Sequence, residues 1–185
     1  MLDATLLPLR NDRAVLRAMS LSDAGPYASG TADPSVREFA HLPEPEYTEA
    51  SVTTLIEGEI GAGLRRGDLA VLTIADPDTD AFAGSLVLFG IEADAVEVGF
   101  WVHPAHRGRG LAGAALCLAA TFARGSGFTR LTARTGPENV ASQRVLEQAG
   151  FTRGAQVRDV APSGAAVSLL PYAREIGQSP LQSTE

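Results

Sequence analysis

The sequence predicts a single α/β domain, and three of its features indicate this fold class. The chain has 185 residues, a length typical of one domain that buries a sizeable core. Residues 69–102 hold three short apolar segments separated by turns, which is the pattern of an antiparallel meander. A glycine-rich turn and an amphipathic helical run follow directly after the meander. We find no internal repeat and no sign of a second domain.

Composition and charge exclude several other classes of protein. A hydrophobic content of 45% and a charged content of 20% are ordinary for a soluble globular chain. The sequence contains no long apolar run and no signal segment, so we expect a cytoplasmic protein with no membrane partner. The single cysteine, Cys117, allows no internal disulfide. A net charge of −7 argues against general binding to nucleic acid.

The N-terminal half is predicted to alternate between strands and helices. Residues 13–19 form a first strand, and Ser22 opens a helix that extends to about residue 31. Residues 35–47 contain two prolines and are predicted to be irregular. Apolar residues at a spacing of four predict a helix over residues 48–66. The strands of the meander follow at residues 69–75, 81–91 and 96–102.

The C-terminal half continues this alternation. A helix, a strand and a second helix are predicted over residues 108–124, 128–134 and 139–149. Residues 151–160 and 165–176 are predicted to form a closing hairpin around Pro162–Gly164. We therefore expect one domain over residues 1–176 and a disordered tail over residues 177–185.

The stretch from residue 96 to residue 113 contains the clearest chemical signal. Its first half alternates as a β-strand does, with Val96, Val98, Phe100 and Val102 on one face and Glu97, Gly99, Trp101 and His103 on the other. A turn of arginine and glycine then leads into a helix whose apolar stripe is Leu111, Ala115, Leu118 and Phe122. A helix start presents unpaired N–H groups and positive charge, and glycines let a ligand approach the backbone. With Arg107 and Arg109 beside them, these groups predict a phosphate or pyrophosphate site.

Two better-known phosphate motifs do not fit this stretch. Gly108–Gly113 matches the dinucleotide pattern G-x-G-x-x-G, but that class needs an acidic residue about 20 positions later for the ribose. The segment from Arg107 to Pro137 contains no Asp or Glu. A Walker P-loop requires a lysine, and this sequence has none. Both classes are therefore excluded.

Two motifs instead resemble those of one known family. Arg107-Gly108-Arg109-Gly110-Leu111-Ala112 resembles the pyrophosphate motif Q/R-x-x-G-x-G/A of the GCN5-related N-acetyltransferases, the GNAT superfamily. Residues 139–151 resemble the family element N-x-x-S-x-x-x-L-x-x-x-G-F, and the two motifs occur in the family's order. With Asp33-Pro34 and the strand at 13–17, they most resemble the RimJ/RimL-type branch of ribosomal-protein N-acetyltransferases. The resemblance extends over roughly residues 10–175.

The resemblance implies a fold and a cosubstrate. The fold is expected to be a single GNAT-like domain with a mixed, mostly antiparallel central sheet of about seven strands and helices on both faces. The cosubstrate is expected to be acetyl-CoA, with no metal. Its pyrophosphate is expected at Arg107, Gly108, Arg109, Gly110, Leu111 and Ala112. The pantetheine arm is expected along the edge of the central strand, near Trp101, Val102, Asn139 and Ser142.

Glu97 is the candidate general base. The pKa of an α-amine is near 8 and that of a lysine amine is about 10.4, so most of the acceptor is protonated at neutral pH. Glu97 shares a strand face with Trp101 and with Gly99, which leaves room for a water or an amine, and the family often has an acidic residue there. The alternative is that Glu97 faces solvent or forms an ion pair with an arginine. Trp101 is predicted to line the substrate cleft rather than the core.

Ser142 is the candidate proton donor to the departing thiolate. The pKa of a thiol is about 8.5, so a donor assists its departure. Many relatives use a tyrosine, but Tyr27, Tyr47 and Tyr172 lie outside the second motif, and the RimJ/RimL-type branch is similar to this chain in carrying serine. The alternative is a hydroxyl that bonds to the backbone at a helix start. Asn139 is expected to cap this helix as well as to contact the pantetheine arm.

The remaining reactive side chains are weaker candidates. Cys117 lies in a helix of Leu, Ala and Phe and is predicted to be a core thiol rather than a nucleophile. His41, His103 and His106 lack the spacing of metal ligands.

The function implied by the resemblance is acetyl transfer to a primary amine. The RimJ/RimL-type motifs favour the N-terminal α-amine of a protein or peptide. The same scaffold would also suit a small amine such as an antibiotic, a polyamine or an amino acid, or a CoA-binding module without catalysis. A homodimer is compatible with the sequence, which does not decide the oligomeric state.

Overall fold

The computed structural model describes residues 1–160 and 166–177. The described residues form nine strands in the order β1-β2-β3-β4-β5-β6-β9-β7, with β8 paired to β9. Among these pairs only β5 and β6 run parallel. The strands are β1 (Leu9–Arg10), β2 (Val15–Ala18), β3 (Ala70–Ala75), β4 (Phe82–Glu92), β5 (Ala95–Val102), β6 (Arg130–Thr135), β7 (Thr152–Arg153), β8 (Val157–Val160) and β9 (Ala166–Glu175).

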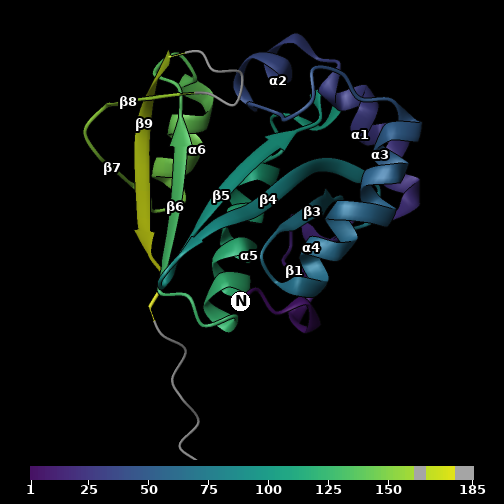
Figure 1. Cartoon of the computed structure of the whole chain (residues 1–185), viewed down its shortest axis with the longest axis horizontal. Helices are drawn as coiled ribbons and strands as arrows, with labels where there is room; N and C mark the ends of the chain where they lie inside the picture. The colour runs from purple at the N-terminus through teal and green to yellow at the C-terminus, as the bar shows by residue number, and fades with distance from the viewer. Residues whose placement is uncertain (161–165, 178–185) are drawn as a thin grey trace, which may run out of the picture.

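Helices cover both faces of this sheet. Helices α5 and α6 lie over one face, and α1, α3 and α4 lie over the other (Figure 1). The α-helices are α1 (Ala24–Thr31), α2 (Pro34–Phe39), α3 (Glu49–Leu55), α4 (Gly61–Arg66), α5 (Leu111–Gly125) and α6 (Val140–Gln148). Short helical turns are η1 (Ala4–Leu6), η2 (Leu21–Asp23), η3 (Ile56–Ile60) and η4 (Pro104–His106).

The mixed, mostly antiparallel sheet with helices on both faces confirms the predicted fold class. The described residues contain nine strands rather than about seven because β1 and β7, of two residues each, extend the sheet at its edges. β8 and β9 pair antiparallel with Val157 opposite Leu169, as expected for a closing hairpin. The predicted turn at Pro162–Gly164 and all of the predicted tail except Gly177 lie outside the described residues.

Helix α2 (Pro34–Phe39) occupies part of the segment 35–47 that was predicted to be irregular, and that prediction is wrong for residues 35–39. The Asp33 side chain accepts hydrogen bonds from the N–H groups of Ser35 and Val36 at 3.1 and 3.2 Å. Pro34 stands at the first helical position, where a missing N–H costs no hydrogen bond. The N-cap residue Asp33 is therefore the feature of the sequence that indicates this helix. It was overlooked because Pro43 and Pro45, later in the segment, favoured an irregular conformation.

The predicted helix over residues 48–66 is confirmed but interrupted. Gly58 adopts φ −96° and ψ −107°, which are not helical angles, and the distorted turn η3 separates α3 from α4. Thr48 caps the start of α3 by accepting a hydrogen bond from the Ser51 N–H at 3.1 Å. Gly67 ends α4 in a left-handed conformation with φ 75°, as a C-terminal glycine commonly does.

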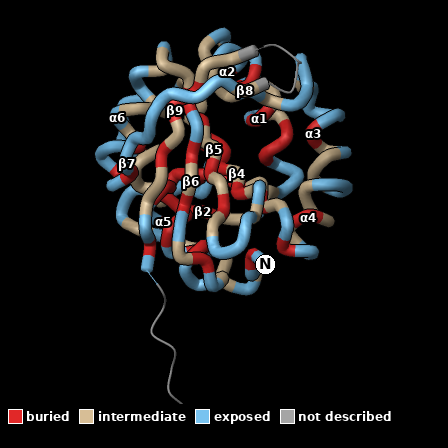
Figure 2. Tube along the Cα trace, turned by 60° about the vertical axis from the view of Figure 1, so that its left-hand side comes forward, coloured by how far each residue is buried: buried red, intermediate tan, exposed pale blue. Residues whose placement is uncertain are grey.

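The larger core lies between the sheet and α5. The predicted stripe of α5 is buried throughout: Leu111, Ala115, Leu118 and Phe122 are at most 6% exposed. Val96 and Val98 of β5 belong to the same core, whereas Trp101 on the opposite face of β5 packs with Tyr27 and Phe82 in a second core beneath α1 and α3. Buried residues accordingly concentrate along the central strands (Figure 2).

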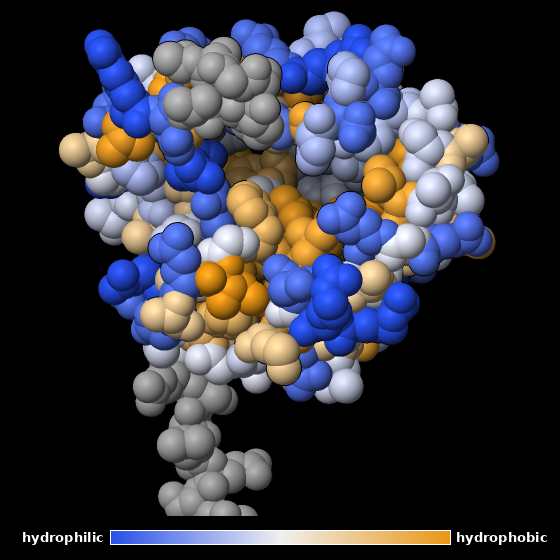
Figure 3. Space-filling model, in the orientation of Figure 1, coloured by the Kyte–Doolittle hydropathy of each residue, from blue (hydrophilic) through white to orange (hydrophobic). Residues whose placement is uncertain are grey.

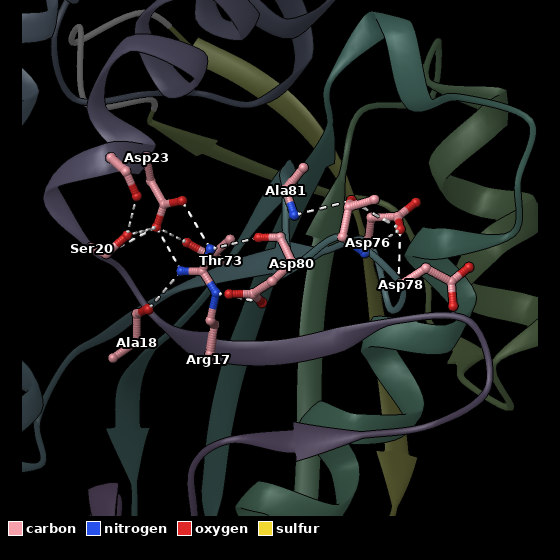
Figure 4. A network of polar contacts seen from close by, with 11 residues as sticks. Arg17, Ala18, Ser20, Asp23, Thr73, Asp76, Asp78, Asp80 and Ala81 are labelled. Carbon is pink, nitrogen blue, oxygen red and sulfur yellow. Dashed lines mark hydrogen bonds and ion pairs between the residues drawn. The ribbon is translucent and has the colours of Figure 1, made fainter.

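A polar network fixes the loop between β3 and β4. Arg17 of β2 donates to Asp23 at 2.7 Å and to Asp80 at 3.0 Å, and Thr73 donates to Asp23 at 2.9 Å (Figure 4). Because Asp23 is only 2% exposed, these bonds satisfy a carboxylate that burial would otherwise destabilise. The network holds the 76–80 loop against β2, and this loop supplies Asp76 to the candidate site.

Candidate active site

The candidate site is built around an opening in the sheet. β5 and β6 pair only between Ala95 and Glu97 on one strand and Arg130 and Thr132 on the other. Beyond Glu97, no described strand pairs with this edge of β5, so its backbone N–H and C=O groups remain available to an extended ligand. A parallel pair that separates after three residues therefore leaves a gap bordered by β5, β6 and α6.

Two cavities meet at this gap. The first cavity, of about 870 Å³, extends along the starts of α5 and α6. The second cavity, of about 570 Å³, lies over the face of the sheet that carries Trp101, on the side of α1 and α3. The residues that line both cavities are Phe39, Ala40, Phe100, Trp101, Asn139 and Ser142. The shared lining residues let ligands in the two cavities approach each other through the sheet.

The first cavity ends at the predicted anion turn. Gly108 and Gly110 have φ angles of 76° and 74°, a left-handed conformation that costs other residues about 1–2 kcal/mol. α5 begins at Leu111 rather than at Gly108, because Gly110 is its N-cap. The first N–H groups of α5 have no partner within the helix, and residues 110–113 line the cavity. This geometry suits a phosphate or pyrophosphate.

Arg107 and Arg109 are both held by carboxylates. Arg107 Nη2 lies 2.8 Å from Asp33 Oδ1, and Arg109 Nη2 lies 2.7 Å from Asp76 Oδ2. Hydrogen bonds from Ser35 and then from Arg107 lower the pKa of Asp33 to about 2. The Arg109 guanidinium is the largest cause that lowers the pKa of Asp76, also to about 2. The two arginines thus tie the turn to α2 and to the 76–80 loop, and their contact with phosphate stays a prediction.

Sequence reasoning missed Arg13, a further cation at this turn. A Cβ added to Gly110 would lie 3.0 Å from Arg13 Nη1, so the guanidinium sits directly against the turn. Arg13 is exposed, lines the first cavity and forms no ion pair with any described residue. No local motif could have revealed it, because Arg13 stands far from the turn in the sequence.

Glu97 lies in the second cavity and is paired with an arginine. Arg134 of β6 donates to Glu97 Oε1 at 2.9 Å and to Asp159 at 2.5 Å. The Glu97 side chain is 18% exposed, so its carboxylate is open to the cavity while Arg134 fixes its position. The hydrogen bond that Arg134 donates to Glu97 is the largest cause that raises the pKa of Arg134, and the contact with Asp159 adds to it. The expected alternative, an ion pair between Glu97 and an arginine, is therefore confirmed. The role of Glu97 as a general base stays a prediction.

Asn139 and Ser142 stand where the cavities join. Asn139 Oδ1 accepts a hydrogen bond from the Ser142 N–H at 3.1 Å, which confirms that Asn139 caps α6. Trp101 is 8% exposed and packs edge-on against Tyr27, with ring centroids 5.2 Å apart. It therefore belongs to a core and lines the cavities as well. Val102 packs against the larger core and lines the first cavity.

The structure corrects the prediction for Cys117. This thiol is exposed and lines the first cavity, although a core position was expected. Cys117 falls between Leu116 and Leu118 on α5, outside the stripe that faces the sheet. No group of three or more His, Cys, Asp or Glu side chains in residues 1–160 and 166–177 is arranged to hold a metal ion. No helix within these ranges is long and apolar enough to cross a membrane.

The open edge of β5, the glycine turn at the start of α5 and the joined cavities suit a transferase that binds two substrates. A family model described as an acetyltransferase (GNAT) domain matches residues 13–152. The chain belongs to this family and is an acyltransferase.

Several solved structures have the same fold as this chain. A GNAT-family acetyltransferase from Bacillus anthracis is 18% identical, with a TM-score of 0.77 and coverage of 92% of this chain and 99% of that chain. Mycobacterium smegmatis RimJ, solved with CoA-disulfide, is 22% identical, with a TM-score of 0.77 and coverage of 88% and 81%. A Salmonella typhimurium acetyltransferase, described as modifying the N-terminal serine of ribosomal protein L7/L12, is 20% identical, with a TM-score of 0.74 and coverage of 89% and 96%.

Proposed function

We propose that this enzyme transfers the acetyl group of acetyl-CoA to the N-terminal α-amine of a protein or peptide. The observation that most supports the proposal is the junction of the two cavities through the gap between β5 and β6. One cavity has the anion turn, and the other contains Glu97. An acyl donor and an amine that enter from opposite faces would meet beside Ser142. A cytoplasmic location and a homodimer stay predictions from the sequence.

In the proposed mechanism, the amine attacks the carbonyl carbon of the thioester. Glu97, directly or through a water, takes the proton that frees the amine's electron pair. The C–N bond forms, the C–S bond breaks, and the sulfur leaves with its electron pair. Ser142 Oγ–H donates a proton to that thiolate, and the second proton of the amine replaces it through solvent. The N–H groups at the start of α5 and Arg13 would hold the pyrophosphate.

The first experiment measures thiol release from acetyl-CoA with three groups of acceptors. These are peptides with a free α-amine, the same peptides blocked at the α-amine but retaining a lysine, and small amines. We expect turnover only with the unblocked peptides. Turnover confined to small amines would contradict the proposal. Binding of CoA without any turnover would support the CoA-binding module instead.

Two variants test the proposed roles. We expect Glu97→Gln to lower kcat/KM by about 100-fold, chiefly below about pH 8 where the amine is protonated, because the amide cannot accept the proton. Ser142→Ala should lower kcat, since the thiolate loses its proton donor. Glu97→Gln should leave the Kd for CoA, measured by calorimetry, nearly unchanged, because Glu97 lines only the second cavity. Unchanged kcat/KM in both variants would overturn these two assignments.

A further inference from the structure

The second cavity has an apolar floor that leads to Glu97. Val71, Val87 and Gly99 lie directly opposite one another across β3, β4 and β5. In the neighbouring register position Phe89 lies directly opposite Glu97. All five residues line the cavity and are neither fully buried nor fully exposed. Hydrophobic surface is visible at the bottom of the hollow in the middle of this face (Figure 3).

Gly99 lets the neighbouring apolar side chains lie close to the backbone of β5. A Cβ added there would lie 3.1 Å from Val87 Cγ1 and 3.8 Å from Phe89 Cε1. The first distance is shorter than an ordinary contact, so Val87 and Phe89 pack against Gly99 and form one continuous apolar surface with it. Gly99 also follows Glu97 on the same strand face, about 7 Å along the strand. An apolar group on this surface would contact Val87 and Phe89 while an attached amine reached Glu97.

The charges around this cavity favour a cation. The lining includes the carboxylates of Glu44, Glu59, Glu97 and Asp159 and the single guanidinium of Arg134. A cavity wall with an excess of negative charge and low-dielectric surroundings attracts a positively charged ligand. A protonated amine would therefore be drawn into the cavity that contains the candidate base.

We infer that the preferred acceptor carries a large apolar side chain on the carbon that bears the amine. For a peptide this means leucine, methionine or phenylalanine as the first residue; the inference rests on the proposed function. Such a side chain covers Val71, Val87 and Phe89, and removal of this apolar surface from water favours binding. A first serine would leave that surface hydrated. The preference thus differs from the N-terminal serine described for the Salmonella protein.

The experiment compares kcat/KM for two series of acceptors with the full-length enzyme and acetyl-CoA. One series consists of peptides that differ only in the first residue, which is Leu, Met, Phe, Ala or Ser. The other compares leucinamide with serinamide, which have the same α-amine and side chains without a peptide. We expect the large apolar side chains to be preferred by about tenfold or more, within the range that hydrophobic pockets achieve.

A substitution in the apolar floor tests whether the floor causes this preference. Val87→Thr keeps the shape of the side chain but replaces one methyl group by a hydroxyl. It should therefore lower the Leu-to-Ser ratio of kcat/KM at least threefold. Val71→Thr is the second variant if Val87→Thr does not fold. Val157→Thr is the matched control, because Val157 is 42% exposed and does not line the cavity. Its ratio should equal that of the wild type.

The outcomes separate this inference from the proposed function. Peptide turnover with serine or alanine equal to or better than leucine would overturn the inference and leave the proposed function intact. Turnover of the amides without turnover of any peptide would contradict the proposed function, and the leucinamide-to-serinamide ratio would then decide the inference. An unchanged ratio in both floor variants would also overturn it.

Discussion

At the scale of single residues, Arg134 determines the charge environment of Glu97. Their contact at 2.9 Å fixes the position of the Glu97 carboxylate in the second cavity. We expect Arg134→Met to lower kcat/KM by about tenfold, because Glu97 loses the partner that holds it in one orientation. The rate is measured at pH 7 and saturating acetyl-CoA.

Two further variants test this explanation. Arg134→Lys should restore most of the wild-type kcat/KM because it keeps a hydrogen-bond donor near Glu97. Arg144→Met is the control, since Arg144 is exposed on α6 and lines neither cavity. An unchanged kcat/KM in Arg134→Met would mean that Glu97 does not need this partner for its proposed role.

Arg13 is the second residue whose role is testable alone. We expect Arg13→Ala to raise the Kd for CoA by about tenfold, the loss of one charge-assisted hydrogen bond. Calorimetric titration at two salt concentrations measures this change, which should shrink at high salt. Arg10→Ala is the control because Arg10 is exposed on β1 and does not line the cavity. Equal Kd values for both variants would remove Arg13 from the phosphate site.

At the scale of elements, the contact between α1 and β5 depends on Gly30. A Cβ added to Gly30 would lie 2.6 Å from Trp101 and 2.8 Å from His103. Gly30→Ala should therefore separate α1 from β5 and destabilise the protein by about 1–3 kcal/mol. Gly113→Ala is the opposite case, because nothing lies within 4 Å of its added Cβ in helix α5. It should stabilise by about 0.5–1 kcal/mol.

Urea unfolding followed by far-UV circular dichroism measures both glycine variants. The two changes replace the same residue type in a helix, so helix propensity alone predicts the same sign for both. Stabilisation by Gly30→Ala would show that α1 does not pack on Trp101 as closely as these distances require.

At the scale of the whole molecule, ion pairs join distant segments and make stability depend on pH. Asp76 connects the β3–β4 loop to Arg109, and its pKa is lowered from 3.8 to about 2, chiefly by that hydrogen bond. The stabilisation is thus complete above about pH 4 and is lost as the pH falls toward 2. We expect Asp76→Asn to be less stable than the wild type at pH 7 and the difference to shrink toward pH 2.

Chemical denaturation across this pH range measures the difference. Asp78→Asn in the same loop is the control, because the exposed Asp78 forms no ion pair with the described residues. A difference that stays constant from pH 7 to pH 2 would mean that Asp76 stabilises the loop without its charge.

Local sequence patterns predicted most of the helices and strands, and the part of the candidate site formed by β5, the glycine turn and α5. The alternation in β5, the glycines of the turn and the stripe of α5 lie within one short stretch, so neighbouring residues suffice to recognise them. Helix α2 was missed because its Asp33-Pro34 start competes with the prolines that follow. Arg13 was missed because its position at Gly110 arises from strand packing between distant segments.

The sequence by itself determined the fold class, the glycine turn before α5, the Asn139 cap and the residue types available for acetyl transfer. Each depends on backbone geometry within a few residues, which side-chain type and spacing control. Only the tertiary structure decided that β5 and β6 separate after Glu97, that Arg134 pairs with Glu97, and that two cavities join at Ser142. These features depend on sheet register and long-range packing, for which one local pattern carries no information.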